Sequence, residues 1–196
     1  MMAVLAACAL SSCASSRYAA RARRPGALQF FDERTGSNLS VVDQPLIFAR
    51  RRTDVAAFAH DFATLVAIEI DVSGTDRDYL LLYRWSTVDP RLSAPPGPDQ
   101  GELRILADGR ELDLKPRRHL PVSLKYRSLL HVPNHGDVVA YAYRVSLRDL
   151  RDIAASRYLQ LRMPQQRPRL PFSLWADARR ALARFAGDRR APHAPP

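Results

Sequence analysis

The feature that most constrains the fold is an alternation of side chains in the middle of the chain. Residues 62–72 carry mostly β-branched side chains at every second position, and Glu69 and Asp71 lie between them. Because successive side chains of a strand point to opposite faces, this period of two predicts a long β-strand. Residues 79–85 follow the turn sequence of residues 73–76, so we expect the two segments to form a hairpin.

Short apolar segments separated by turn residues extend this pattern along the chain. Asp108-Gly109 is typical of a tight hairpin turn, because glycine accepts the positive φ that such a turn requires. The proline-rich residues 93–98 predict a loop, and residues 120–132 are expected to be extended. About eight segments are expected to be short strands: 39–42, 46–49, 62–72, 79–85, 102–106, 111–114, 138–145 and 158–163.

Two helices are expected beside the strands. Ser146 can cap a short helix that runs to about Ser156, with Asp149 in its first turn. Residues 174–185 predict a C-terminal helix with an apolar stripe, which comprises Trp175, Ala178, Leu182 and Phe185. We expect this stripe to pack on the sheet. The alternative is that the stripe lies on a membrane surface. The expected fold is therefore mainly β, a β-sandwich or open barrel with one short and one C-terminal accessory α-helix.

The first thirteen residues resemble a bacterial lipoprotein signal. An apolar run closes on Leu10, Ser11, Ser12 and Cys13, which supply the branched apolar residue, the two small residues and the cysteine of the lipobox. The residues around Cys8 fit the same pattern but leave an apolar stretch of only seven residues before that cysteine. We therefore expect Cys13 to be lipidated, and Leu10, Ser11 and Ser12 to be the residues that the signal peptidase recognises.

Other interpretations of this N-terminal segment remain open. A spanning helix needs about 20 apolar residues, and this run is far shorter. A mitochondrial transit peptide would account for the acid-free arginine cluster of residues 17–24, although the arginines all follow the apolar block. An ordinary secretory signal would be cleaved within residues 11–16. No Lys or Arg precedes the apolar run, as expected if translation starts upstream of Met1.

Cysteine usage favours lipidation. Cys8 and Cys13 are the two cysteines of the chain, so Cys13 has no thiol partner in the mature domain. Several acyl chains on Cys13 would anchor the protein firmly, since each buried methylene contributes about 0.8 kcal/mol. Ala14 follows the cysteine, and the resemblance then implies the periplasmic face of the outer membrane in the bacterial envelope. The membrane is thus the expected partner, through the anchor at Cys13.

The charge distribution argues against a nucleic-acid partner. The net charge is +10, but residues 27–147 carry 15 basic and 16 acidic side chains, so the excess lies at the two ends. A nucleic-acid-binding domain concentrates its cations on a folded surface. We expect a signal peptide at 1–12, the lipidated cysteine and a flexible Arg-rich tether at 13–37, a single mainly-β domain at 38–186 and a disordered Pro-rich tail at 187–196.

The sequence offers weak catalytic candidates. It lacks the nucleophile elbow, the phosphate loop and the spaced cysteine pairs that carry common chemistries. His131 and His135 flank Pro133, so we interpret them as turn residues rather than metal ligands. His60 and Asp61 are adjacent, and neighbouring side chains of a strand or a helix point apart, so we expect a surface or capping role for them. We therefore expect no catalytic residue, no metal and no cofactor.

An aromatic row could instead bind a ligand. Tyr79, Tyr83 and Trp85 alternate along one strand face and are a candidate platform for a glycan or peptide, although packing within the core also explains such a row. Residues 45–50, 85–89 and 107–110 resemble small proteobacterial lipoproteins, a resemblance that carries no activity and no site residues.

These observations lead to one expected function and two alternatives. We expect a membrane-anchored envelope lipoprotein that is a non-enzymatic binding or assembly accessory module facing the periplasm, with an envelope protein as partner. The first alternative is an envelope hydrolase or metal-dependent enzyme whose site is nonlocal in sequence, built on residues such as His60, His119, His131 and His135. The second is a soluble secreted or organellar protein, which applies if the N-terminal segment is not a lipoprotein signal.

Overall fold

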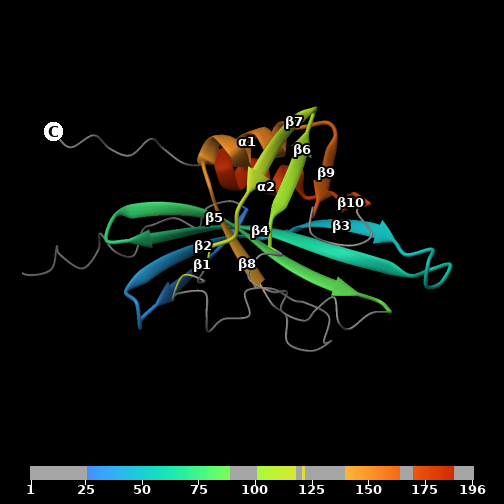
Figure 1. Ribbon diagram of the computed structural model, residues 1–196. Helices are drawn as coiled ribbons and strands as arrows, with labels where there is room; N and C mark the ends of the chain where they lie inside the picture. The colour runs from blue at the N-terminus through green and yellow to red at the C-terminus, as the bar shows by residue number, and fades with distance from the viewer. Residues whose placement is uncertain (1–25, 89–100, 118–120, 122–139, 164–169, 188–196) are drawn as a thin grey trace, which may run out of the picture.

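One antiparallel sheet of ten strands, accompanied by two helices, makes up the described part of the protein (Figure 1). The computed structural model describes residues 26–88, 101–117, 121, 140–163 and 170–187. The expected mainly-β fold with one short and one C-terminal helix is confirmed. The strands are β1 (Ala27–Asp32), β2 (Ser37–Val42), β3 (Leu46–Arg51), β4 (His60–Val72), β5 (Thr75–Ser86), β6 (Leu103–Ala107), β7 (Arg110–Leu114), β8 (Ala140–Val145), β9 (Leu159–Arg162) and β10 (Phe172–Ala176).

The long hairpin of β4 and β5 is the centre of the sheet. The two strands pair without interruption from Val72 opposite Thr75 to Asp61 opposite Ser86. Ser73 and Gly74 form the turn with φ values of 52° and 84°, the positive angles of a two-residue hairpin turn. The hairpin expected from the alternation is therefore confirmed, with strands longer than the pattern indicated.

One edge of β4 pairs with β5, and the other edge pairs with both β2 and β3, which follow each other along the chain. Val41 pairs with Ile68, whereas Leu46 pairs with Leu65, so four residues of this edge face only two residues of β4. Pro45 lies in the irregular stretch, where its missing N–H does not interrupt the ladder. The break separates the sheet into two halves, because β1 continues beside β2 and β10 continues beside β3.

The half of the sheet beyond β3 curls back over the long strands. Its order is β10, β9, β6 and β7, and Figure 1 shows β6, β7 and β9 on the same side of β4 and β5 as both helices. The segment that leads into β6 lies against β8, because Tyr143 Oη of β8 donates to the Gly101 carbonyl at 2.6 Å. The Arg117 amide also donates to the Ala142 carbonyl at 2.8 Å. The sheet therefore has a concave interior, as an open barrel does.

Both faces of β4 are buried. All residues from Asp61 to Asp71 are buried, including Glu69, which the alternation placed among polar, outward positions. Directly opposite residues share a face, so the register places Leu65 and Leu82 together on the interior side. The interior contains the large buried side chains Phe48, Leu80, Leu103, Ile105, Tyr143, Leu161 and Phe172.

The helices pack against each other and against the sheet. In α1 (Leu147–Ala155), Ser146 Oγ accepts from the Asp149 amide, and Asp149 Oδ2 accepts from the Ser146 amide, both at 3.1 Å. This reciprocal capping box confirms the expected helix start. The second helix, α2 (Arg179–Gly187), buries Leu182 and Phe185, two members of the stripe that the sequence predicted to face the core.

Two segments differ from the sequence-based expectation. Residues 27–32, expected in the tether, form β1, an edge strand that leaves Leu28 and Phe31 about half exposed. Residues 172–176, partly expected in the second helix, form β10, so Trp175 is a strand residue and the helix begins only at Arg179. The physical reason is that these residues pair with β3 and β9, and this pairing selects their period-two alternation over the helical spacing.

Several expectations fall outside the described residues. These are the signal peptide, Cys13 and most of the tether, the Pro-rich loop, nearly all of residues 120–132, and the C-terminal tail beyond Gly187. Within the described ranges, no helix is long and apolar enough to cross a membrane.

Candidate functional site

A buried charged cluster lies at one end of the concave interior. Arg50, Asp61 and Ser86 are neighbours across β3, β4 and β5, so their side chains share the interior face. Arg50 Nη2 lies 2.5 Å from Asp61 Oδ2, and Ser86 Oγ donates to Asp61 Oδ1 at 2.8 Å. The side chains of Arg50 and Asp61 are only 2% and 0% exposed. Asp61 is thus held by charged and polar donors on both carboxylate oxygens.

A second guanidinium completes the neutralisation of Asp61. Arg52 Nη1 lies 3.3 Å from Asp61 Oδ2, while Arg52 Nε lies 2.8 Å from the more exposed Asp54. The hydrogen bond to Asp54 raises the pKa of Arg52, and the same bond lowers the pKa of the Asp54 carboxyl. Asp61 is held by two guanidinium groups, and breaking such a buried pairing costs several kcal/mol, so the carboxylate is not available to react with a ligand.

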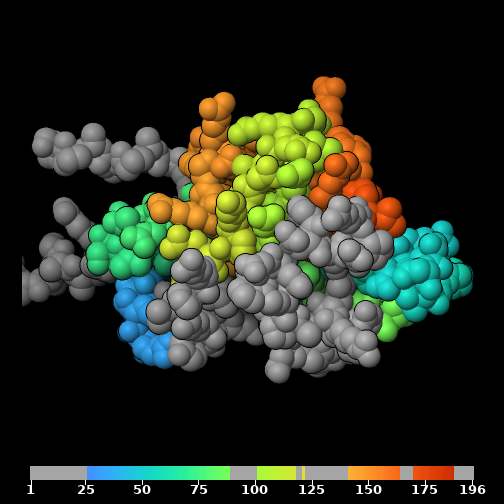
Figure 2. Space-filling model, viewed as in Figure 1, coloured from blue at the N-terminus to red at the C-terminus, as the bar shows by residue number. Residues whose placement is uncertain are grey.

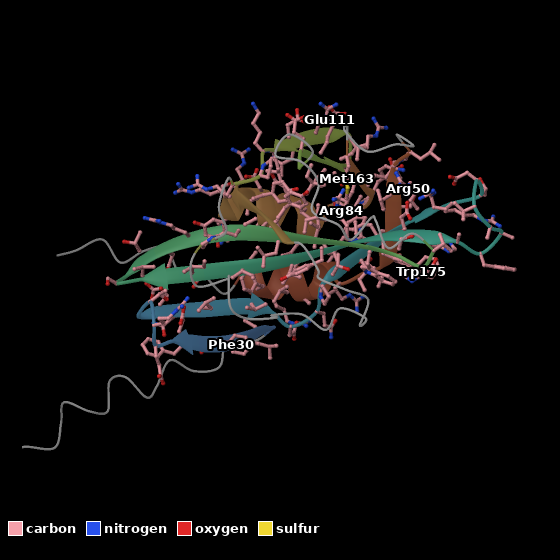
Figure 3. All side chains as sticks on the ribbon, turned by 60° about the horizontal axis from the view of Figure 1, so that its bottom comes forward. Phe30, Arg50, Arg84, Glu111, Met163 and Trp175 are labelled. Carbon is pink, nitrogen blue, oxygen red and sulfur yellow. The ribbon has the colours of Figure 1, made fainter. Side chains whose placement is uncertain are left out.

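Arg84 differs from Arg50 although both point into the interior. Arg84 is 8% exposed, and its position in β5 is directly opposite Ala63 of β4. Within the described residues, no carboxylate pairs with its guanidinium and no hydrogen bond satisfies it; its contact is with the Tyr141 ring, 5.4 Å from the guanidinium carbon to the centroid. Burial lowers the pKa of Arg84. Figure 3 shows Arg50 and Arg84 at the same end of the sheet as Trp175.

Two tyrosines from β8 lie beside Arg84. Burial raises the pKa of Tyr143, whose hydroxyl donates to the Gly101 carbonyl, and burial also raises the pKa of Tyr141. Tyr141 Oη is enclosed and has no hydrogen-bond partner among the described residues. The Tyr141 ring packs closely on Gly101, where an added Cβ would lie 2.8 Å from Cε1. Gly101 therefore fixes the position of the ring that lies beside Arg84.

An aromatic patch, formed by His60, Phe62, Trp85 and Trp175, lies on the opposite face of the same strands. Phe62 stacks on Trp85 with centroids 4.0 Å apart, and Trp175 contacts Phe62 edge-on at 5.8 Å and His60 at 5.4 Å. Trp175 is 62% exposed. The connection between β3 and β4 projects at this end of the molecule (Figure 2) and carries Phe58, which is 88% exposed.

The expected ligand platform is only partly accessible. Tyr79 and Tyr83 are buried, at 5% and 7% exposure, and burial raises the pKa of Tyr83 to about 12. Trp85 is half-buried and belongs to the aromatic patch through its stack on Phe62. The lipobox residues Leu10, Ser11, Ser12 and Cys13 lie outside the described residues.

The histidines do not form a site in the described structure. His60 points toward Trp175 while Asp61 points into the interior, so the adjacent side chains point apart as expected. The expected surface or capping role is wrong for Asp61, because its carboxylate is buried against Arg50. His119, His131 and His135 lie outside the described residues. In the part of the chain that is described, no three His, Cys, Asp or Glu side chains are arranged to hold a metal ion.

Arg50, Arg84 and Trp175 are not among the site residues expected from the sequence. Arg84 continues the interior series of Leu80 and Leu82, and an arginine in such a series is the signal that could have identified it. Trp175 was assigned to a helix, which hid its place beside His60.

Comparison with known protein families, curated proteins and solved structures finds no match to this chain.

Proposed function

We propose that this protein is a lipid-anchored module of the bacterial envelope that binds a partner rather than catalysing a reaction. The support for the anchor is the sequence Leu10-Ser11-Ser12-Cys13 in front of a domain that has no further cysteine. The first strand, β1, begins at Ala27, so only a short segment separates Cys13 from the sheet. A domain attached in this way acts at the membrane surface, on components of the envelope.

The observation that carries the binding role is the aromatic patch. Trp175 is exposed, whereas Phe62 beneath it is buried and His60 and Trp85 are half-buried. An exposed tryptophan is costly in water, and one held on other aromatic rings is typical of a site that contacts another molecule. Tryptophan is also enriched among the residues that dominate the binding energy of protein interfaces. Trp175 is the most exposed member of the patch, supported by contacts with His60 and Phe62.

The charged cluster fits a binding module better than an enzyme. Its one carboxylate, Asp61, is fully buried and already paired with Arg50 and Arg52. An enzyme that used Asp61 as an acid or base would need to free that carboxylate, and breaking a buried ion pair costs about 3–5 kcal/mol. The described cluster therefore supports the stability of the sheet end that carries the aromatic patch.

The anchor is tested by comparing the two cysteines. Cys13→Ser is expected to block processing and to release the protein from the membrane fraction of a Gram-negative host, as globomycin is expected to block processing of the unaltered chain. Cys8→Ser is the matched control, because Cys8 precedes the expected cleavage site, and it should leave membrane retention unchanged. Unaltered processing and distribution of the Cys13→Ser protein would contradict the anchor.

The binding role is tested at the aromatic patch itself. A photo-crosslinking phenylalanine analogue placed at position 175 in intact cells is expected to yield one defined adduct with an envelope protein. The same analogue at position 158 is the control, since Tyr158 is 51% exposed and lies outside the aromatic patch. Equal adducts at both positions, or none at position 175, would contradict the proposed surface.

A further inference from the structure

We propose that Arg84 and Tyr141 form a binding site for the carboxylate group of a ligand, inside the curled sheet. The site lies on the interior face, whereas the aromatic patch lies on the other face of the same strands, so the inference is independent of the proposed function. Nothing in the sequence analysis pointed to this pair.

The Arg84 guanidinium has no partner among the described residues. A buried cation is normally paired, because desolvation of an unpaired charge costs several kcal/mol. Arg50, on the neighbouring part of the same face, follows this rule through Asp61. Arg84 is 8% exposed and has no ion pair or hydrogen bond within the described residues. A bound anion would supply the partner that the described residues do not.

The ring under the Arg84 guanidinium carries a hydroxyl that is also without a partner in the described structure. Leu82 pairs with Tyr141 across β5 and β8, so Tyr141 lies on the same face as Arg84 and its ring contacts the guanidinium. Tyr141 Oη is enclosed and unpaired in the described structure. The hydroxyl of Tyr141 and the guanidinium above its ring are thus two donors on one face of neighbouring strands that the described residues leave without a hydrogen bond. Close packing on Gly101 holds the Tyr141 ring in place.

The donors and the charge fit a carboxylate. A guanidinium presents two parallel N–H groups that match the two oxygens of a carboxylate, and a phenol can donate one further hydrogen bond. Asp61 and Asp54 balance the charges of Arg50 and Arg52, so Arg84 contributes one positive charge that no described carboxylate pairs with. A monoanion balances that charge, whereas a phosphate dianion would leave an excess negative charge in the interior.

Solvent has a route to the site. Arg84 is 8% exposed, so part of the residue remains in contact with solvent. The residue Tyr141 is itself only partly buried. A small carboxylate can therefore exchange with bulk water without unfolding of the sheet.

The experiment is a titration of the full chain, solubilised in detergent, with sodium acetate at constant ionic strength. The readout is the NMR signal of the arginine Nε–H groups. We expect one arginine signal to shift saturably, and the same signal to be missing from the Arg84→Met protein. Arg84→Met should weaken acetate binding about tenfold or more, the loss expected when charge-assisted hydrogen bonds are removed.

Two further variants make the result specific. Arg144→Met is the matched control, because Arg144 is an exposed arginine of β8 that lies on the opposite face from Tyr141, and it should leave the affinity unchanged. Tyr141→Phe removes one oxygen and should weaken binding several-fold while the fold is kept. The absence of a saturable shift in the unaltered protein, equal affinity of the Arg84→Met protein, or tighter binding of inorganic phosphate than of acetate would overturn the proposal.

Discussion

Arg50 and Asp61 form a buried ion pair across β3 and β4, with 2.5 Å between Nη2 and Oδ2. The pair lies at the sheet end where Ser86 donates to the same carboxylate and Arg52 approaches it from the β3–β4 connection. Arg50 also lies over the Phe172 ring of β10, 4.6 Å from the guanidinium carbon to the centroid. Asp61 therefore ties β4 to β3, the strand from which the curled half of the sheet departs.

Removing the carboxylate should destabilise the fold. Asp61→Ala leaves two guanidinium groups without their shared partner, and the expected loss is about 3–5 kcal/mol of unfolding free energy. Urea unfolding followed by circular dichroism measures this loss. Asp54→Ala is the control, because Asp54 is 55% exposed and pairs with Arg52 at the surface. Equal losses in the two variants would contradict the structural role assigned to Asp61.

Replacing Arg84 should have the opposite effect on stability. Arg84→Met keeps the length of the side chain and removes an uncompensated buried charge, so the ligand-free protein should gain about 1–4 kcal/mol. Chemical unfolding in a carboxylate-free buffer measures the gain. Arg144→Met, on the exposed side of β8, should change stability by less than about 0.5 kcal/mol. A loss of stability in the Arg84→Met protein would mean that the guanidinium is satisfied in the folded chain.

Gly101 should tolerate no side chain. A Cβ at this position would lie 2.7 Å from Pro116 Cγ and 2.8 Å from Tyr141 Cε1, so Gly101→Ala forces the tyrosine ring away from Arg84. We expect a loss of about 1–3 kcal/mol, typical of overpacking, visible as a lower thermal midpoint. Gly187→Ala is the matched control, because nothing lies within 4 Å of its added Cβ. A Gly101→Ala protein as stable as the control would contradict the close packing.

Asp108 should make the fold sensitive to acid. Hydrogen bonds from the amides of Tyr158 and then Arg157 lower the pKa of the Asp108 carboxyl from its ordinary value of 3.8. A group with a depressed folded pKa contributes stability that is present above the unfolded pKa and is lost as the pH falls through the folded value. Stability should therefore decline below about pH 4.

Asp108→Asn provides the comparison. Asparagine tolerates the positive φ of 48° at this turn but does not titrate. Unfolding free energies measured between pH 7 and pH 2.5 should show a shallower acid decline in the Asp108→Asn protein than in the unaltered protein. Identical pH profiles would show that Asp108 does not contribute to the acid sensitivity.

The sequence pattern was most informative where one segment carries its own signal. The alternation of residues 62–72, the Asp108-Gly109 turn and the capping box at Ser146 all act over a few residues, and the structure has the hairpins and the helix that they predict. Both glycine turns adopt the positive φ angles that their sequences require.

The elements that sequence analysis missed depend on neighbours that are distant in sequence. The edge strand β1 buries little apolar surface, since Leu28 and Phe31 remain exposed, and it exists through its ladder with β2. Trp175 and Ala178 fit a helical stripe equally well, so only pairing with β3 distinguishes strand from helix at residues 172–176. The Arg84–Tyr141 contact likewise depends on the β5–β8 register, which no local pattern specifies.

The central claim is that Cys13 anchors a binding module to the envelope, and the intact mass of the protein tests it most directly. The protein is extracted with detergent from membranes of a Gram-negative host and analysed by mass spectrometry. We predict a mature chain that begins at Cys13 and carries the added mass of a thioether-linked lipid with several acyl chains. A chain with a free Cys13 thiol, or one that retains residues 1–12, would contradict the account.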